Sequence, residues 1–152
     1  MTAPRDAVRM TEEEVRAFLH GRHTMSLATL GPDGRPHLVA VWYGFIGEDI
    51  GFFSYRRSQK TRNLQRDPRL TCMVECGRTY DELSGVSLAG RAELVEDEED
   101  RVALGLSTTE RYEGELTDEG RERVRVSIGK RLAVRVRIDR VTSWDHRKLS
   151  AG

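Results

Sequence analysis

The sequence has no long apolar run, no net charge and little cysteine. No apolar segment approaches the roughly 20 residues that a membrane-spanning helix needs. The N-terminal residues MTAPRDAVRMTEEE lack the hydrophobic stretch of a secretory signal, so we expect a cytoplasmic protein. Basic and acidic side chains are balanced at 25 each. This balance argues against a general nucleic-acid-binding protein, since such proteins usually carry a basic excess.

The chain has only two cysteines, Cys72 and Cys76, in the strand-like segment LTCMVEC. On a strand they would share a face but stand roughly 13 Å apart, which is too far for a mutual disulfide. A zinc site would need a tight turn and further ligands at suitable spacing, and the sequence offers none. We therefore expect two buried thiols and no bound metal.

The patterning predicts one mainly β domain with helical inserts (α+β) over residues 1–152, with residues 1–10 as a flexible N-terminus. A capping box at Thr11 to Glu14 starts a helix that ends at Gly21. Strands are predicted at 24–30, 36–46, 50–55, 70–76, 86–95 and 132–141. Helices are predicted at 58–66, from the acidic run 93–100 to about 112 with Val102, Ala103 and Leu106 in the core, and at 117–128. Six antiparallel strands in a chain of this length favour a small barrel.

The predicted strand at 36–46 is apolar on both faces. One face would carry Leu38, Ala40, Trp42 and Ile46, and the other Val39, Val41, Tyr43 and Phe45. An antiparallel strand in a small domain normally leaves one face in water. We therefore expect a partner subunit, a flat ligand or both to cover the second face.

The stretch RRSQKTRNLQRDPR at 56–69 concentrates positive charge. It contains one acid, Asp67, and its basic residues are Arg56, Arg57, Lys60, Arg62, Arg66 and Arg69. It follows the apolar run 50–55 and is predicted to form a helix that Ser58 caps and Asp67-Pro68 ends. A helix N-terminus offers free N–H groups and a positive dipole end, which suit a phosphate. The alternative is a solvated basic helix held to the core by Leu64 alone.

Taken in order, four motifs resemble the pyridoxamine phosphate oxidase-like split β-barrel family, and most closely its actinobacterial branch that uses the deazaflavin coenzyme F-420. They are DGRPHLVAVWY (33–43), SQKTRNLQRDPR (58–69), LAGRAELVED (88–97) and SWDHRKL (143–149). The resemblance implies a six-stranded antiparallel split barrel of the FMN-binding type. It also implies a homodimer with two cofactor sites at the interface, which would cover the second apolar face.

The resemblance further implies a set of cofactor-binding residues. Those that match the cofactor-phosphate motif are Lys60, Thr61, Arg62 and Asn63. Those expected beside the ring and its sugar-like chain are Val41, Trp42, Phe53, Ser54 and Tyr55. Trp144 would approach the site across the dimer. Some deazaflavin relatives carry a cation two residues before the motif lysine, where this chain has Ser58, so Arg56 or Arg57 would have to replace it.

The choice of cofactor depends on charge. FMN ends in one phosphate, for which a helix N-terminus and one or two cations suffice, whereas F-420 carries a phosphodiester and a tail of several glutamates. The basic stretch has more charge than one phosphate needs, which favours F-420 and hydride transfer to a small unsaturated, carbonyl or imine substrate. The alternatives are an FMN-dependent oxidoreductase on the same fold, or a flavin- or haem-binding carrier without turnover. Pyridoxamine phosphate oxidases proper hold the substrate phosphate with a C-terminal arginine segment, which has no equivalent here beyond SWDHRKLSAG.

No catalytic residue is predicted. The sequence shows no Ser–His–Asp, Cys–His or metal-binding arrangement. The possible proton donors are His37, Tyr43, Tyr55 and His146, and a structural role is the alternative for each. A nucleic-acid-binding barrel would need aromatic side chains among its basic residues, and the segment 56–69 has none.

Overall fold

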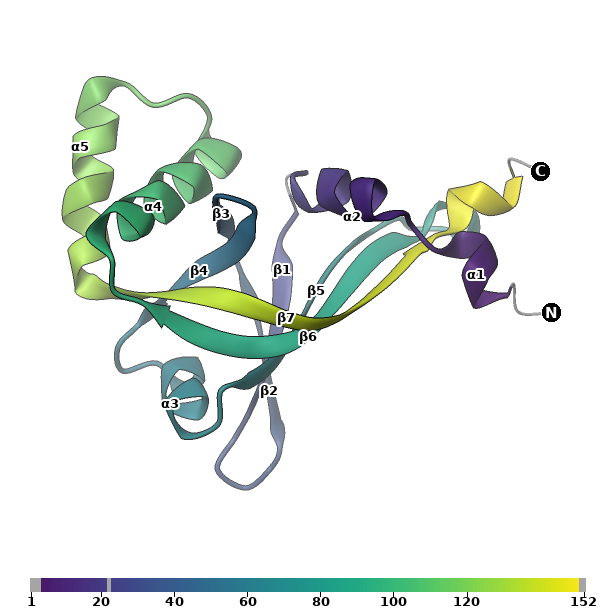
Figure 1. Ribbon diagram of the computed structural model, residues 1–152, viewed down its shortest axis with the longest axis horizontal. Helices are drawn as coiled ribbons and strands as arrows, with labels where there is room; N and C mark the ends of the chain where they lie inside the picture. The colour runs from purple at the N-terminus through teal and green to yellow at the C-terminus, as the bar shows by residue number, and fades with distance from the viewer. Residues whose placement is uncertain (1–3, 22, 151–152) are drawn as a thin grey trace.

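The computed structural model describes residues 4–21 and 23–150. Its centre is one antiparallel sheet in the order β2-β1-β5-β6-β7-β4-β3 (Figure 1). The strands are β1 (Met25–Leu30), β2 (Pro36–Val41), β3 (Gly44–Ile46), β4 (Asp49–Tyr55), β5 (Arg69–Cys76), β6 (Ser84–Val95) and β7 (Arg131–Asp145). The helices are α1 (Arg5–Val8), α2 (Glu12–Leu19), α3 (Gln59–Arg66), α4 (Glu98–Glu113) and α5 (Asp118–Ser127). Short 3-10 helices lie at Tyr80–Glu82, Ile128–Lys130 and His146–Ser150.

The sheet curls into a half-barrel because the chain crosses from one edge to the other between β2 and β3. These two strands are the opposite edges of the sheet, yet only Trp42 and Tyr43 separate them. Three Cα–Cα steps of about 3.8 Å limit the distance from Val41 to Gly44 to about 11 Å. The two edges therefore approach each other here, and the inner face of the sheet encloses the main core.

The strand predicted at 36–46 is two strands, so the sheet has seven strands and the prediction of six was wrong. Pairing with β1 ends at Val41, and pairing with β4 begins at Gly44. The segment is apolar on both faces, so no change in the sequence pattern marks the break. In the structure the alternation of burial ends at Trp42, and Tyr43 to Ile46 are all buried, including Ile46, which was expected on the same face as Trp42. Gly44 lies so close to α4 that a Cβ there would overlap the Thr108 side chain.

The core on the inner face includes Met25, Leu27, Phe52, Val74, Val86 and Leu88. Cys72 belongs to it, as predicted, and burial raises the pKa of its thiol to about 12. Cys76 is exposed, so the prediction of two buried thiols was wrong. It is the last residue of β5, and the positive φ of Gly77 then turns the chain away.

Helices α4 and α5 form a layer over β3 and β4 (Figure 1). The predicted helices are confirmed, and Asp97 and Thr117 cap them. Val102 is buried as predicted, whereas Ala103 is exposed and Leu104 is fully buried, so the predicted core face was displaced by one position. The reason is that α4 packs on two sides, against the sheet at β3 and β4 and against α5, and a single apolar stripe does not describe that arrangement.

The N-terminal segment is partly packed against the rest of the protein. In the segment expected to be flexible, residues 1–3 lie outside the described part. Helix α1 follows, and Val8 and Met10 are buried.

On the outer face of β2, Leu38 is 69% exposed and Ala40 is also exposed. Within the described ranges, no helix has the length and apolar character that a membrane crossing requires.

Candidate cofactor site

Helix α3 begins where β4 ends, and its N-terminus is tied to that strand. Ser58 caps the helix by accepting a hydrogen bond from the Thr61 N–H at 3.4 Å, and its own N–H donates to the Tyr55 carbonyl at 3.1 Å. Asp67 is the C-cap. The predicted Ser58-capped helix is therefore confirmed, and its first turn lies beside the end of β4.

Two of the residues that match the phosphate motif turn their side chains into the protein. The Thr61 hydroxyl donates to the Tyr55 carbonyl at 2.6 Å and lies 2.5 Å from the Ser54 hydroxyl. The Asn63 amide donates to Thr29 Oγ1 at 3.0 Å, and its oxygen accepts hydrogen bonds from Gln59 and Arg66. These contacts hold α3 between β1 and β4. The helix is thus anchored by more than Leu64, which corrects that part of the solvated-helix alternative.

The cationic side chains just before and at the start of α3 have no acidic partner in the described part of the chain. Among the described residues, no carboxylate oxygen lies within 4.0 Å of the charged atoms of Arg56, Arg57, Lys60 or Arg62. Desolvation lowers the pKa of Lys60, which is half-buried. A partly desolvated lysine without a counter-ion, next to a helix N-terminus, can gain an anionic partner at little further desolvation cost.

The residues expected beside the cofactor ring separate into two groups. Trp42 is 51% exposed, Tyr55 is 66% exposed and Phe53 is half-buried. Val41 packs against the main core, and Ser54 is buried against Thr61. Since successive side chains of a strand alternate between its faces, Phe53 and Tyr55 share the face opposite to that of Ser54. This aromatic surface continues directly into the basic residues that follow β4.

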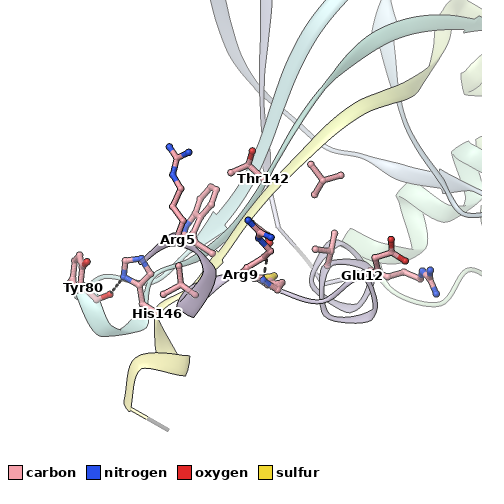
Figure 2. A pocket seen from close by; sticks show the side chains of 13 residues that line it. Arg5, Arg9, Glu12, Tyr80, Thr142 and His146 are labelled. Atoms are coloured by element: carbon pink, nitrogen blue, oxygen red, sulfur yellow. Dashed lines mark hydrogen bonds between the residues drawn. The ribbon is translucent and has the colours of Figure 1, made fainter. Parts of the chain in front are cut away.

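Trp144 lies at the other end of β7, in a cavity of about 870 Å³ between α1, α2 and that strand (Figure 2). Its indole covers Gly85, where a Cβ would overlap the ring. Near it, His146 Nδ1 lies 2.6 Å from the Tyr80 carbonyl oxygen. Tyr55 pairs with Arg131 at the start of β7, so Trp144 is thirteen residues further along the strand, up to roughly 40 Å away. Within one chain Trp144 does not meet the α3 site, and the expected approach needs a second chain.

A family model described as "Pyridoxamine 5'-phosphate oxidase" matches residues 11–145. The chain belongs to this family. Its members are flavin-binding oxidoreductases on a split barrel, which agrees with the curled antiparallel sheet. The family resemblance inferred from the four motifs is confirmed.

Individual relatives show how far the similarity extends. The pyridoxine/pyridoxamine 5'-phosphate oxidase of Rubrobacter xylanophilus is 32% identical over 84 residues, which are 55% of this chain and 39% of the relative. The chain thus matches well under half the length of that curated relative. A conserved hypothetical protein of Mycobacterium tuberculosis superposes with a TM-score of 0.91 at 46% identity over 98% of this chain and 93% of its own. A solved F-420 reductase gives a TM-score of 0.66 at 26% identity over 86% of this chain and 98% of its own.

The four possible proton donors lie in different environments in this family member. Tyr43 is fully buried, its hydroxyl donates to the Leu19 carbonyl at 2.6 Å, and desolvation raises its pKa to about 12, so it is structural. His37 is half-buried on β2, and His146 is at the Trp144 end. Tyr55 alone of the four lies on the aromatic surface beside α3. Among residues 4–21 and 23–150, no three acidic, histidine or cysteine side chains gather as metal ligands would.

Sequence reasoning missed two residues of the aromatic surface. Tyr112 of α4 stacks on Trp42 with ring centroids 4.4 Å apart and an interplanar angle of 3°. The Arg131 guanidinium lies 4.9 Å from the centre of the Phe53 ring. Both contacts join segments that are distant in the sequence, so no local pattern could have indicated them.

Proposed function

We propose that this protein is an oxidoreductase that transfers a hydride between reduced coenzyme F-420 and a small unsaturated, carbonyl or imine substrate. The observation that carries the choice of coenzyme is a group of four cations at the start of α3 that have no acidic partner among the described residues: Arg56, Arg57, Lys60 and Arg62. A single phosphate needs one or two of them. A phosphodiester followed by several carboxylates would use all four.

Each part of the site has a role in this proposal. The α3 N-terminus and Lys60 hold the phosphodiester, while Arg56, Arg57 and Arg62 receive the acidic tail. The surface of Trp42, Phe53 and Tyr55 lies beside the ring. Thr61 and Asn63 act indirectly, because their hydrogen bonds position the helix. When bound, the deazaflavin supplies hydride-transfer chemistry, and the protein supplies orientation and electrostatics.

The experiment is a titration of the protein with F-420 and with FMN, followed by fluorescence and calorimetry. We expect F-420 to bind more tightly, and its affinity to fall more steeply with salt because it carries more charge. Lys60→Glu and Arg62→Glu should each weaken F-420 binding by about tenfold or more, since each replaces an attraction with a repulsion. The matched control is Arg125→Glu, an exposed arginine of α5 outside the site, which should leave the affinity within about twofold.

Two results would count against the proposal. Tighter binding of FMN, with no effect of Arg62→Glu, would favour the FMN-dependent alternative. Equal losses in the Arg125→Glu control and the two α3 variants would mean that the basic turn is a solvated surface. Tight binding of either coenzyme without reduction of any substrate would favour a carrier.

We also propose a homodimer in which the outer face of β2 meets a second copy and Trp144 reaches the partner's site. The supporting observation is the exposure of Leu38 and Ala40 on β2 and of Trp42 just after it. Light scattering at micromolar concentration should give twice the 17.3 kDa chain mass. Leu38→Glu should shift the protein to monomers, because it would bury charge at the interface. A monomeric parent protein would remove this proposal.

A further inference from the structure

We propose that the cleft between α4, α5 and the start of β7 binds the carboxylate of a planar, conjugated substrate, so that the enzyme acts on small organic monoanions. The cleft measures about 320 Å³, and Trp42, Phe53, Leu116, Arg123, Val124 and Arg131 are among the residues that line it. It opens beside the aromatic surface, through the shared residues Trp42 and Phe53. The binding of an anion in the cleft does not depend on the proposed function, whereas its interpretation as substrate recognition does.

The two cations in the cleft have no acidic partner within the part of the chain that the structure describes. Among the described residues, neither Arg123 nor Arg131 has a carboxylate within 4.0 Å, and neither guanidinium donates a hydrogen bond. Arg131 lies over the Phe53 ring, 4.9 Å from its centre. Its backbone is fixed, because Arg101 donates to its carbonyl at 2.9 Å and to the Ile128 carbonyl at 2.7 Å. The cleft therefore has a positioned charge at its β7 side.

The other polar groups in the cleft have already donated their protons. The hydroxyls of Thr108, Thr109 and Ser127 donate to the carbonyls of Leu104, Gly105 and Val124 at 2.8, 2.9 and 3.0 Å. A hydroxyl has one proton, so these three groups can only accept from a ligand. Besides the indole N–H of Trp42, the free side-chain donors among the lining residues are thus the two guanidiniums, whose planar geometry suits a carboxylate. This set favours a ligand that presents an anion.

The remaining surface selects the shape and charge of the ligand. Phe53, Leu116, Val124 and Ile128 give it an apolar floor, where a conjugated body can pack. Glu113 is the one acid among the lining residues, so the formal charge of the cleft is +1. That charge is matched by one carboxylate, and a dianion would be opposed by Glu113.

The test uses sorbate, a planar conjugated carboxylate, and its neutral amide, with no coenzyme added. In the Trp144→Phe background Trp42 is the remaining tryptophan, so its fluorescence reports on the cleft. We expect sorbate to bind at least about tenfold more tightly than the amide, because the charge-assisted hydrogen bonds are lost with the amide. Arg131→Gln and Arg123→Gln should each reduce this preference, and the double variant should abolish it. Glu113→Gln should strengthen sorbate binding.

Matched variants separate charge from folding. Arg131→Lys keeps the charge and should retain part of the preference, and Arg125→Gln, on the same helix as Arg123 but outside the cleft, should retain all of it. Equal affinities of sorbate and its amide in the parent protein would overturn the inference, as would a full preference in the double variant. Because no coenzyme is present, failure of the F-420 titration would leave this result unchanged. If sorbate binds in the cleft but does not compete with the substrate of the reaction, the role of the cleft in substrate recognition is overturned.

Discussion

Two sets of arginines in this protein differ in what they contact. Arg111 donates to the carbonyls of Leu19, His20, Gly21 and Tyr43, at 3.3, 2.9, 2.7 and 3.1 Å. Arg101 and Arg135 are likewise occupied by carbonyls or carboxylates. The second set, Arg56, Arg57, Arg62, Arg123 and Arg131, has no acidic partner among the described residues.

The difference separates support of the fold from binding of ligands. Arg101 and Arg111 supply donors to carbonyls at the ends of chain segments, whereas Arg135 pairs with the carboxylates of three acids from other elements. The arginines of the second set flank the two proposed sites, at the start of α3 and in the α4–α5 cleft. Other arginines, such as Arg35, Arg78 and Arg140, also have no carboxylate within 4.0 Å among the described residues, but they line neither site. At each of the two sites several such arginines lie together, and the resulting local positive charge favours anionic ligands there.

The largest effect that we predict is the loss of stability when Arg111, a member of the first set, is replaced. Arg111→Met should lower the free energy of unfolding by about 3 kcal/mol, because several carbonyls at the C-terminus of α2 lose their donor and the cation–π contacts with Tyr43 and Phe45 disappear. Arg62→Met should change it by no more than about 0.5 kcal/mol. Urea denaturation at fixed protein concentration, followed by circular dichroism, measures both.

The division of the arginines into two sets requires that Arg111→Met destabilises the protein much more than Arg62→Met does. Equal destabilisation would mean that Arg62 also supports the fold, and the division into two sets would be wrong. Arg111→Lys is a useful intermediate, since it keeps the charge but cannot reach all four carbonyls at once. We expect it to recover about half of the loss.

The elements of the fold could largely be predicted from the sequence, because their signals are local. The capping box at Thr11, the Ser58 cap and the turn at 31–34 each depend on residues within one turn. The division of strand 36–46 could not be predicted in this way. It results from a change of pairing partner, which depends on β1 and β4 and leaves no mark in a segment that is apolar on both faces.

The candidate site could be predicted only in part. The motif located the basic turn, and the helix N-terminus is where the sequence indicated. Periodicity in a short helix did not reveal that Thr61 and Asn63 face inward, because polar residues are ordinarily assigned to the surface and here they bond to Ser54 and Thr29. Arg131 reaches Phe53 through the pairing of β4 with β7, which is a tertiary contact.

The smallest effect we predict sharpens the comparison at Lys60, the one lysine of the α3 group. Desolvation lowers its pKa, so as the pH rises Lys60 loses its charge earlier than an exposed lysine does. An anion bound by Lys60 should therefore be held fully below that pKa and less tightly above it. We expect F-420 affinity to fall by about fivefold, or roughly 1 kcal/mol, between about pH 7 and pH 10.

The control for this pH dependence is Lys60→Arg, which stays charged over the whole range because arginine does not titrate there. Its binding curve should be flat where that of the parent falls. The arginines nearby keep their charge in both proteins, so they contribute a constant attraction. A parent curve that is also flat would mean that Lys60 does not contact the anion, and the phosphodiester would then have to be held by the helix N-terminus and Arg56, Arg57 and Arg62 without it.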